Sequence, residues 1–259
     1  MVDFDRRDGV ATITLSRPDR LNAITDEIVE ELLRILGELA TDTATRVVIL
    51  TGEGRAFCSG MDIQADTPDS DEGRVQRIYR GLVRAGEVVC ALREIPQPVV
   101  AALHGPVAGM AISLALACDL RVASPTMKMV TPFLKLGFSA GDLGLSWMLP
   151  RLIGTARAGE IFYRAQNITA ERALELGLVT MIVEDDLAGA RELAAELMTR
   201  SPFGLRHTKE LLNLAMDAPS LRTHMAIENR TQTMAFLTED LREGFTATLE
   251  RRDPEFRNR

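Results

Sequence analysis

The sequence predicts an α/β fold in which buried strands alternate with helices as far as residue 183, followed by a helical tail. Two observations lead to this prediction. Short Val- and Ile-rich runs bounded by Gly and Pro alternate with stretches of helical apolar spacing, a pattern typical of parallel strands joined by crossover helices. From residue 186 onward only helical spacing remains. The chain carries no repeat of fixed period that would indicate a solenoid.

Length and charge narrow the class of protein further. A chain of 259 residues with 46% hydrophobic residues forms one large domain, or a domain with an appendage. A net charge of −7 argues against nucleic acid as the main partner. Cys58, Cys90 and Cys118 show no metal-ligand spacing, so we expect buried free thiols, no metal site and a reducing cytosol. The charged N-terminus lacks a secretion signal, so we expect a cytoplasmic protein with no membrane span.

The first third of the chain supplies two strands and two helices. Residues 10–15 and 46–51 are short apolar runs and are expected to be strands. Helical spacing covers residues 26–40, with Thr25 suited to the N-cap, and resumes at residues 75–92. Between the second strand and the second helix, the acidic segment 65–73 is expected to be a mobile excursion.

The stretch 98–123 is the one around which the rest is organised. It begins with the apolar run 98–103, which suits a strand covered on both faces. A Gly-rich turn over residues 104–109 then leads into a small-residue helix over residues 110–118. The free N–H groups at such a helix start can hold an anion or an oxyanion. The alternative is a strand–helix unit whose glycines serve only close packing.

The remaining elements follow the same patterns. Strands are expected at residues 120–123, 127–130 and 178–183. Helices are expected at residues 145–152, 156–164, 170–176, 187–199, 202–216, 220–237 and 241–252. Thr169 is expected to cap the helix that starts at residue 170, and Gly177 to end it.

Four motifs together resemble the crotonase superfamily, also called the enoyl-CoA hydratase/isomerase family. They are RPDRLNAI at 17–24, GRAFCSGMDI at 54–63, HGPVAGMAISLALACDLRVAS at 104–124 and LPRLIG at 149–154. The resemblance covers essentially the whole chain. It implies a ββα spiral core, a C-terminal helical region that builds a homotrimer or a dimer of trimers, and an acyl-CoA thioester as ligand with no separate cofactor.

The division expected from this resemblance places the spiral core and the acyl-CoA site in residues 1–200. Residues 201–259 then form the helical oligomerisation region. In the family, two backbone N–H groups hold the thioester oxygen, and they map onto Met61 and Met110. Two such donors stabilise a thioester enolate by about 3 kcal/mol each. The alternative for both Met side chains is plain core filling.

The resemblance also implies residues for the coenzyme. Arg20 matches a basic position near the phosphates, and Arg251 and Arg252 lie in a C-terminal segment that relatives turn toward the coenzyme, sometimes from a neighbouring subunit. The alternative for these last two is a solvated helix face. The remaining coenzyme-side positions are Leu21, Ala23, Ser59, Asp62 and Ile63, of which Asp62 is alternatively structural.

The chain departs from the hydratase pattern at both acid–base positions. Where a hydratase carries two glutamates, this sequence has Ser113 and Phe133, which lack a carboxylate for that chemistry. The resemblance implies that both residues contribute to substrate binding instead. Asp142, in GFSAGDLG, matches a loop position at which dienoyl-CoA isomerases carry a catalytic Asp. Its alternative role is to cap a helix starting near Leu143. A cap would lower the pKa of Asp142, whereas an apolar pocket would raise it.

Three hypotheses remain for function. The first is an enoyl-CoA hydratase or isomerase working through an enolate, with Asp142 as acid and base. The second is a non-catalytic acyl-CoA-binding protein. The third, a remote one, is a Clp-like serine hydrolase using Ser113; however, no histidine follows His104 until His207. We expect His104 to be a buried, hydrogen-bonded turn residue and Asp119 to be structural.

Overall fold

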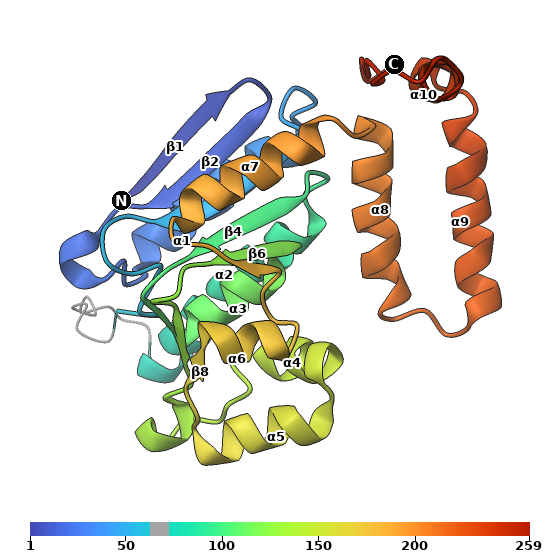
Figure 1. Ribbon diagram of the computed structural model, residues 1–259. Helices are drawn as coiled ribbons and strands as arrows, with labels where there is room; N and C mark the ends of the chain where they lie inside the picture. The colour runs from blue at the N-terminus through green and yellow to red at the C-terminus, as the bar shows by residue number, and fades with distance from the viewer. Residues whose placement is uncertain (63–72) are drawn as a thin grey trace.

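A six-stranded sheet forms the centre of the computed structural model, which describes residues 1–62 and 73–259 (Figure 1). Its order is β1-β2-β3-β4-β6-β9, and every neighbouring pair is parallel except the β1–β2 hairpin. The strands are β1 (Val2–Arg7), β2 (Val10–Leu15), β3 (Val47–Gly52), β4 (Val99–Leu103), β6 (Leu120–Ala123) and β9 (Met181–Ile182).

A second, three-stranded sheet follows from the first without an intervening helix. It has the order β5-β7-β8 and consists of β5 (Pro106–Ala108), β7 (Lys128–Val130) and β8 (Ile168–Thr169). Gly105 joins β4 to β5 with a φ of 52°, and a Cβ at this position would lie 2.1 Å from the Arg55 carbonyl oxygen. Only glycine tolerates both conditions. The predicted α/β fold is confirmed, in the form of two mixed sheets.

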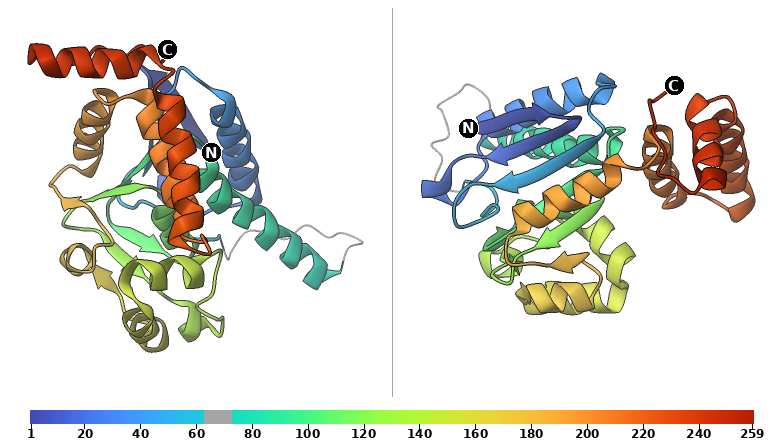
Figure 2. Two further views of the ribbon diagram at one scale, coloured as in Figure 1. Left: turned by 90° about the vertical axis from the view of Figure 1, so that its right-hand side faces the viewer. Right: turned by 45° about the horizontal axis from the view of Figure 1, so that its top comes forward.

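Helices cover both faces of the large sheet. The main core lies between the sheet and the helices α1 (Asp26–Thr41), α2 (Arg74–Glu94) and α3 (Met110–Ala117). A smaller core lies under α7 (Asp186–Met198) on the opposite face (Figure 2). This double cover explains why every residue of β3 and β4 is buried. Gly189 lets α7 pack closely against Val183 in the segment before it, since a Cβ at position 189 would lie 2.7 Å from the Val183 side chain.

The C-terminal helices form an arm on one side of this core, to which the first of them is joined by the Lys209–Asp119 ion pair (Figures 1 and 2). They are α8 (Pro202–Ala215), α9 (Leu221–Ala235) and α10 (Glu239–Glu250). The other helical elements are η1 (Pro18–Arg20), η2 (Phe133–Leu136), α4 (Leu145–Ile153), α5 (Thr155–Arg164) and α6 (Ala170–Glu175). Large apolar side chains are exposed along the arm: Leu212, Leu214, Leu221, Met225, Met234, Phe236, Leu237, Phe245 and Leu249.

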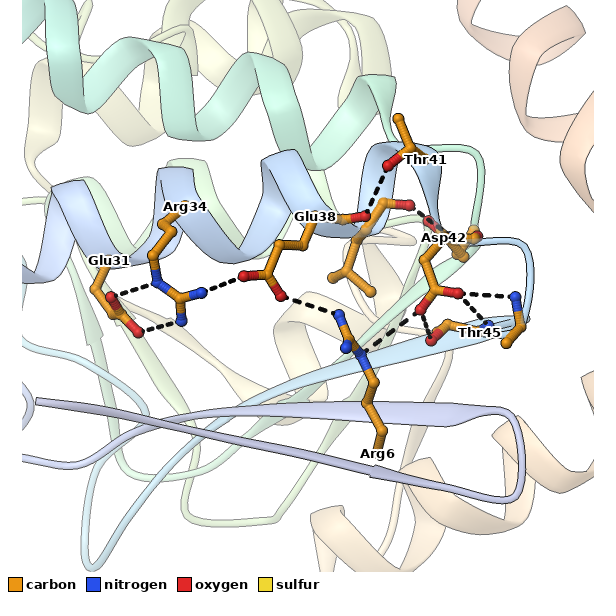
Figure 3. A network of polar contacts seen from close by, with 10 residues as sticks. Arg6, Glu31, Arg34, Glu38, Thr41, Asp42 and Thr45 are labelled. Carbon is orange, nitrogen blue, oxygen red and sulfur yellow. Dashed lines mark hydrogen bonds and ion pairs between the residues drawn. The ribbon is translucent and has the colours of Figure 1, made fainter.

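A ladder of ion pairs joins the edge strand β1 to α1 (Figure 3). Arg6 on β1 contacts Glu38 at 3.2 Å and Asp42 at 3.6 Å. Along α1, Arg34 pairs with both Glu38 and Glu31. These side chains are largely exposed, so each pair contributes at most about 1 kcal/mol. The ladder therefore orients the hairpin, and the main stability comes from the apolar core.

Several expectations need correction. Cys90 is exposed rather than buried, although Cys58 and Cys118 are buried as expected. The charged N-terminus forms β1, because it pairs with β2 along an edge where charged side chains face solvent. The strand expected at residues 178–183 is shorter in the structure, where β9 covers Met181–Ile182. The acidic excursion lies almost entirely within residues 63–72, outside the described residues.

Helix ends were predicted well, with one exception. Thr169 caps α6, its hydroxyl oxygen accepting a hydrogen bond from the Arg172 N–H. Thr25 occupies the N-cap of α1, but its side chain accepts no hydrogen bond from the helix N–H groups. Its hydroxyl instead bonds the Glu27 carboxylate and contributes to a lowered pKa there.

Candidate active site

Three loops of the N-terminal half are joined by backbone hydrogen bonds. The Ile24 N–H donates to the Gly60 carbonyl at 2.8 Å. The loop after β3, which carries Gly60, also pairs with β5 on its other side. The Cys58 N–H donates to the Pro106 carbonyl at 3.2 Å, and the Ala108 N–H donates to the Cys58 carbonyl at 3.0 Å. The loop after β3 is thus held between the loop after β2 and the start of the second sheet.

This arrangement places Gly60 against the start of α3. The φ of Gly60 is 92°, and a Cβ there would lie 2.7 Å from the Ala108 carbonyl oxygen and 3.5 Å from the Met110 nitrogen. Gly60 therefore lies against the backbone at the start of α3. In the described part of the chain, neither the Met61 nor the Met110 N–H donates a hydrogen bond to a protein acceptor.

The two Met side chains belong to the core or its edge. Met110 is 1% exposed within the main core, and Met61 is partly buried against it. Both side chains therefore pack with the main core. Backbone geometry, and not the side chain, distinguishes these two positions.

Asp142 lies on the loop before α4 and does not cap that helix. The helix begins at Leu145, its N-cap residue is Gly144, and it has no side-chain cap. Leu143 and Gly144 have φ values of 45° and 84°, which turn the chain between Asp142 and the helix. Burial raises the pKa of the Asp142 carboxyl above its ordinary value. The direction is the one expected for an apolar site and the opposite of that expected for a cap.

The two residues in the hydratase glutamate positions are buried. Phe133 begins η2 and is 7% exposed, whereas Ser113 on α3 is fully buried. The Ser113 hydroxyl donates to the backbone carbonyl of Asp142 at 3.1 Å. Among the described residues, the histidines have other partners: His104 bonds Asp186 at 2.9 Å between Nδ1 and Oδ2 and is partly rather than fully buried, and His207 and His224 pair with glutamates on their own helices. The serine-hydrolase hypothesis therefore lacks its proton acceptor.

The predicted coenzyme-side residues around η1 form one cluster. Asp62 is 6% exposed at its side chain and pairs with Arg17 at 3.1 Å and Arg20 at 3.5 Å. The Ser59 N–H donates to the Leu21 carbonyl at 2.9 Å. The carbonyl of Ala23 accepts a hydrogen bond from Arg17. The predicted position Ile63 lies outside the described residues.

Arg251 and Arg252 lie elsewhere in the chain. Both directly follow α10, the last helix of the C-terminal arm (Figure 1). Arg252 binds Glu243 through two contacts of 2.5 and 2.9 Å, and Glu250 at 2.7 Å. Within one chain, the structure thus separates these two arginines from the Arg20 cluster.

Comparison with known proteins agrees with this architecture. A family model described as enoyl-CoA hydratase/isomerase matches residues 5–259. The chain belongs to this family. It is 40% identical to the Mycobacterium leprae protein named "Probable enoyl-CoA hydratase echA12", covering 97% of this chain and 87% of that protein. It is 37% identical to 1,2-epoxyphenylacetyl-CoA isomerase of Escherichia coli, covering 96% and 95% of the two chains.

The fold is equally close to solved family members. The crystal structure of an enoyl-CoA hydratase from Bacillus anthracis superimposes with a TM-score of 0.92 at 30% identity, covering 100% of this chain and 99% of that one. The family implies an acyl-CoA ligand. Over residues 1–62 and 73–259, no helix is long and apolar enough to cross a membrane. The same residues contain no group of three or more His, Cys, Asp or Glu that could hold a metal ion.

Asn22 is a buried structural residue beside the Arg20 cluster that the sequence did not single out. It is fully buried at a φ of 56°. Its amide nitrogen donates to the carbonyls of Ala56 at 2.7 Å, Glu53 at 2.9 Å and Phe57 at 3.3 Å. Its side-chain oxygen accepts from the Arg17 N–H at 2.8 Å. The sequence feature that could have identified Asn22 is its position after a turn, where Asn tolerates left-handed backbone.

We expect Asn22→Ala to lower the free energy of unfolding by about 3 kcal/mol, because it leaves buried carbonyls unpaired. Asn22→Gly is the matched control, since it removes the same amide but relieves the positive φ. Urea denaturation measures both. A loss below about 1 kcal/mol in both variants would show that water replaces the amide.

Proposed function

We propose that this protein moves a double bond within an unsaturated acyl-CoA through a thioester enolate. In this proposal the Met61 and Met110 N–H groups hold the thioester oxygen, and Asp142 carries the proton. The observation that supports it most is the Asp142 carboxyl itself: a partly buried group with a raised pKa, on a loop bonded to the same helix that begins with Met110.

The chemistry favours isomerisation over hydration. A single carboxylate can remove a proton from one carbon and return it to another, since the group that accepts the proton afterwards donates it. Hydration by the usual route needs two carboxylates to activate water and protonate carbon, and Ser113 and Phe133 stand in their places. A base with a pKa raised toward the working pH is the better catalyst for such a transfer. The Escherichia coli relative is itself named as an isomerase of a CoA thioester.

The coenzyme is proposed to bind along the cluster of Arg20, Leu21, Ala23, Ser59 and Asp62, with Ile63, which follows Asp62 in the sequence, as a further proposed contact. Because Asp62 partly neutralises Arg20, phosphate binding here depends on Arg20 turning from Asp62 to the ligand. Arg251 and Arg252 are proposed to contribute from a neighbouring subunit of a homotrimer. The exposed apolar side chains of the C-terminal arm support assembly, since such surfaces mark interaction sites.

Incubation with 2-enoyl-, 3-enoyl- and dienoyl-CoA tests the reaction class. We expect interconversion of double-bond positions, with deuterium from heavy water appearing at the α or γ carbon. Net addition of water as the main product would favour the hydratase. Tight binding of all three thioesters without turnover or deuterium uptake would favour the non-catalytic binding protein.

Gly60→Ala tests the proposed oxyanion hole. The new Cβ meets the Ala108 carbonyl and must displace one of the two facing backbones, so we expect kcat to fall by about 100-fold, as for loss of one oxyanion donor. Gly177→Ala is the matched control, because its φ is also positive, at 72°, but no atom lies within 4 Å of the added carbon. Circular dichroism checks folding. A folded Gly60→Ala variant with unchanged kcat would contradict this placement of the hole.

A further inference from the structure

Helix α3 carries two residues that bear on the proposed reaction, Met110 and Ser113. Met110 is its first residue, and Ser113 follows three positions later, one helical turn further along the same side. The two positions are separated by about 4.5 Å along the axis. Both are buried, and α3 packs against α2 and α4. A contact made by Ser113 is therefore held at a fixed distance from the Met110 N–H.

Ser113 makes such a contact with the Asp142 loop. Its hydroxyl donates to the Asp142 carbonyl at 3.1 Å, and the Leu145 N–H donates to the same oxygen at 2.8 Å. The carbonyl that starts the turn into α4 is thus bonded both to α4 and to α3. A buried polar side chain with a single backbone partner acts on the position of that backbone.

The opposite side of the loop rests on α2. A Cβ added to Gly86 would lie 3.9 Å from the Leu143 side chain, and one added to Gly144 would lie 3.9 Å from the Val89 side chain. These contacts are apolar and non-directional. Between them, Leu143 and Gly144 occupy left-handed backbone, which does not by itself orient the preceding residue. The hydrogen bond from Ser113 is a directional contact that joins this loop to α3.

We infer that Ser113 is a positioning residue, which holds the Asp142 carboxyl at a set distance from the Met110 N–H through its bond to the Asp142 carbonyl. This inference rests on the proposed function for its catalytic consequence. The serine thereby takes a different part from the glutamate it replaces: it aligns the acid–base group without exchanging a proton with substrate. In this role its hydroxyl acts through the Asp142 backbone rather than on the substrate, where a direct substrate contact was expected from the sequence.

Ser113→Ala tests the inference. We expect kcat to fall by about 10- to 100-fold with KM little changed, because loss of alignment by about 1 Å costs about that much. The acidic limb of the pH–rate profile should move to lower pH, since a loosened loop lets water reach the carboxyl. Ser124→Ala is the matched control: it removes another buried serine hydroxyl, bonded to Thr126 at 2.7 Å. It should change neither kcat nor the profile.

A double-mutant cycle with Asp142→Asn separates the inferred role from a general one. If Ser113 acts through Asp142, adding Ser113→Ala to the Asn variant should cost nothing further. An equal loss in both backgrounds would overturn the inference, because Ser113 would then act on the fold or on the N–H groups directly.

Titration of the Asp142 carboxyl by carbon-13 NMR, without substrate, distinguishes this inference from the proposed function. A lower pKa in Ser113→Ala than in the wild type supports positioning, even if Asp142→Asn leaves turnover intact and so removes the catalytic proposal. An unchanged pKa together with an additive cycle would overturn the positioning role and leave the catalytic proposal standing.

Discussion

Replacing Asp142 with Asn is expected to lower kcat for double-bond migration by about 10²- to 10⁴-fold, the range for loss of a general acid–base group. Asn has a side chain of the same size as Asp, and the substitution leaves the backbone carbonyl of residue 142 that Ser113 binds unchanged. The loop should therefore stay in place. KM should change little, because the proposed binding contacts lie on other loops. Stopped assays with dienoyl-CoA, or the thioester turned over fastest, measure both constants.

Asp217→Asn is the control for this substitution. Asp217 is an exposed carboxylate at the end of α8, 70% exposed at its side chain, and its contact with Arg151 is a long one at 3.9 Å. Its loss should leave kcat unchanged. If Asp142→Asn retains full activity, Asp142 is not the proton carrier and the enolate chemistry needs another group.

The pH dependence of Asp142 follows from the sign of its pKa shift. Burial raises the pKa in the folded protein above that of the unfolded chain. Protonated Asp142 therefore stabilises the folded state at pH values below the pKa of this group in the unfolded chain. This stabilisation is lost as the pH rises through its pKa in the folded protein. We expect Asp142→Asn to be more stable than the wild type at neutral pH, with the difference vanishing in acid below the unfolded pKa. Thermal unfolding across pH measures it; a variant less stable at neutral pH would contradict the shift.

Replacing Lys209 with Met is expected to lower the free energy of unfolding by about 3 kcal/mol or more, the usual cost of breaking a buried ion pair. The Lys209 side chain is 4% exposed, and its ammonium pairs with Asp119 at 2.9 Å. It also donates to the carbonyls of Leu92 at 2.8 Å and Gln97 at 3.0 Å. Met keeps the apolar stem and removes all three contacts, leaving the Asp119 charge and two carbonyls without this donor.

Lys128→Met is the matched control, since Lys128 is an exposed lysine on β7 whose loss should shift stability by less than about 0.5 kcal/mol. A double variant, Lys209→Met with Asp119→Asn, should recover part of the loss because no charge is then left unpaired. Urea denaturation of all three gives the comparison. Equal effects of the two lysine substitutions would show that the pair does not anchor α8 to the core.

Local sequence signals determined much of the architecture. The apolar run before residue 104 was expected to be a strand covered on both faces, and β4 is buried throughout. The small-residue stretch beginning at Met110 lacks an amphipathic face, which matches a helix, α3, that is buried on all sides. Thr169 capped its helix as predicted. Each of these properties depends on neighbours within one or two turns of chain, which the sequence displays directly.

The tertiary structure decided what depends on distant partners. Asp142 looked equally suited to a cap or an acid–base role, and the left-handed Leu143–Gly144 pair, which delays α4 until Leu145, decided against the cap. The pairing of Lys209 with Asp119 and the bond from Ser113 to the Asp142 loop span long separations in sequence. A pKa or a hydrogen bond depends on which atoms surround a group in space. The sequence shows directly which residues are near neighbours along the chain. Which distant residues surround a group is decided only when the chain folds.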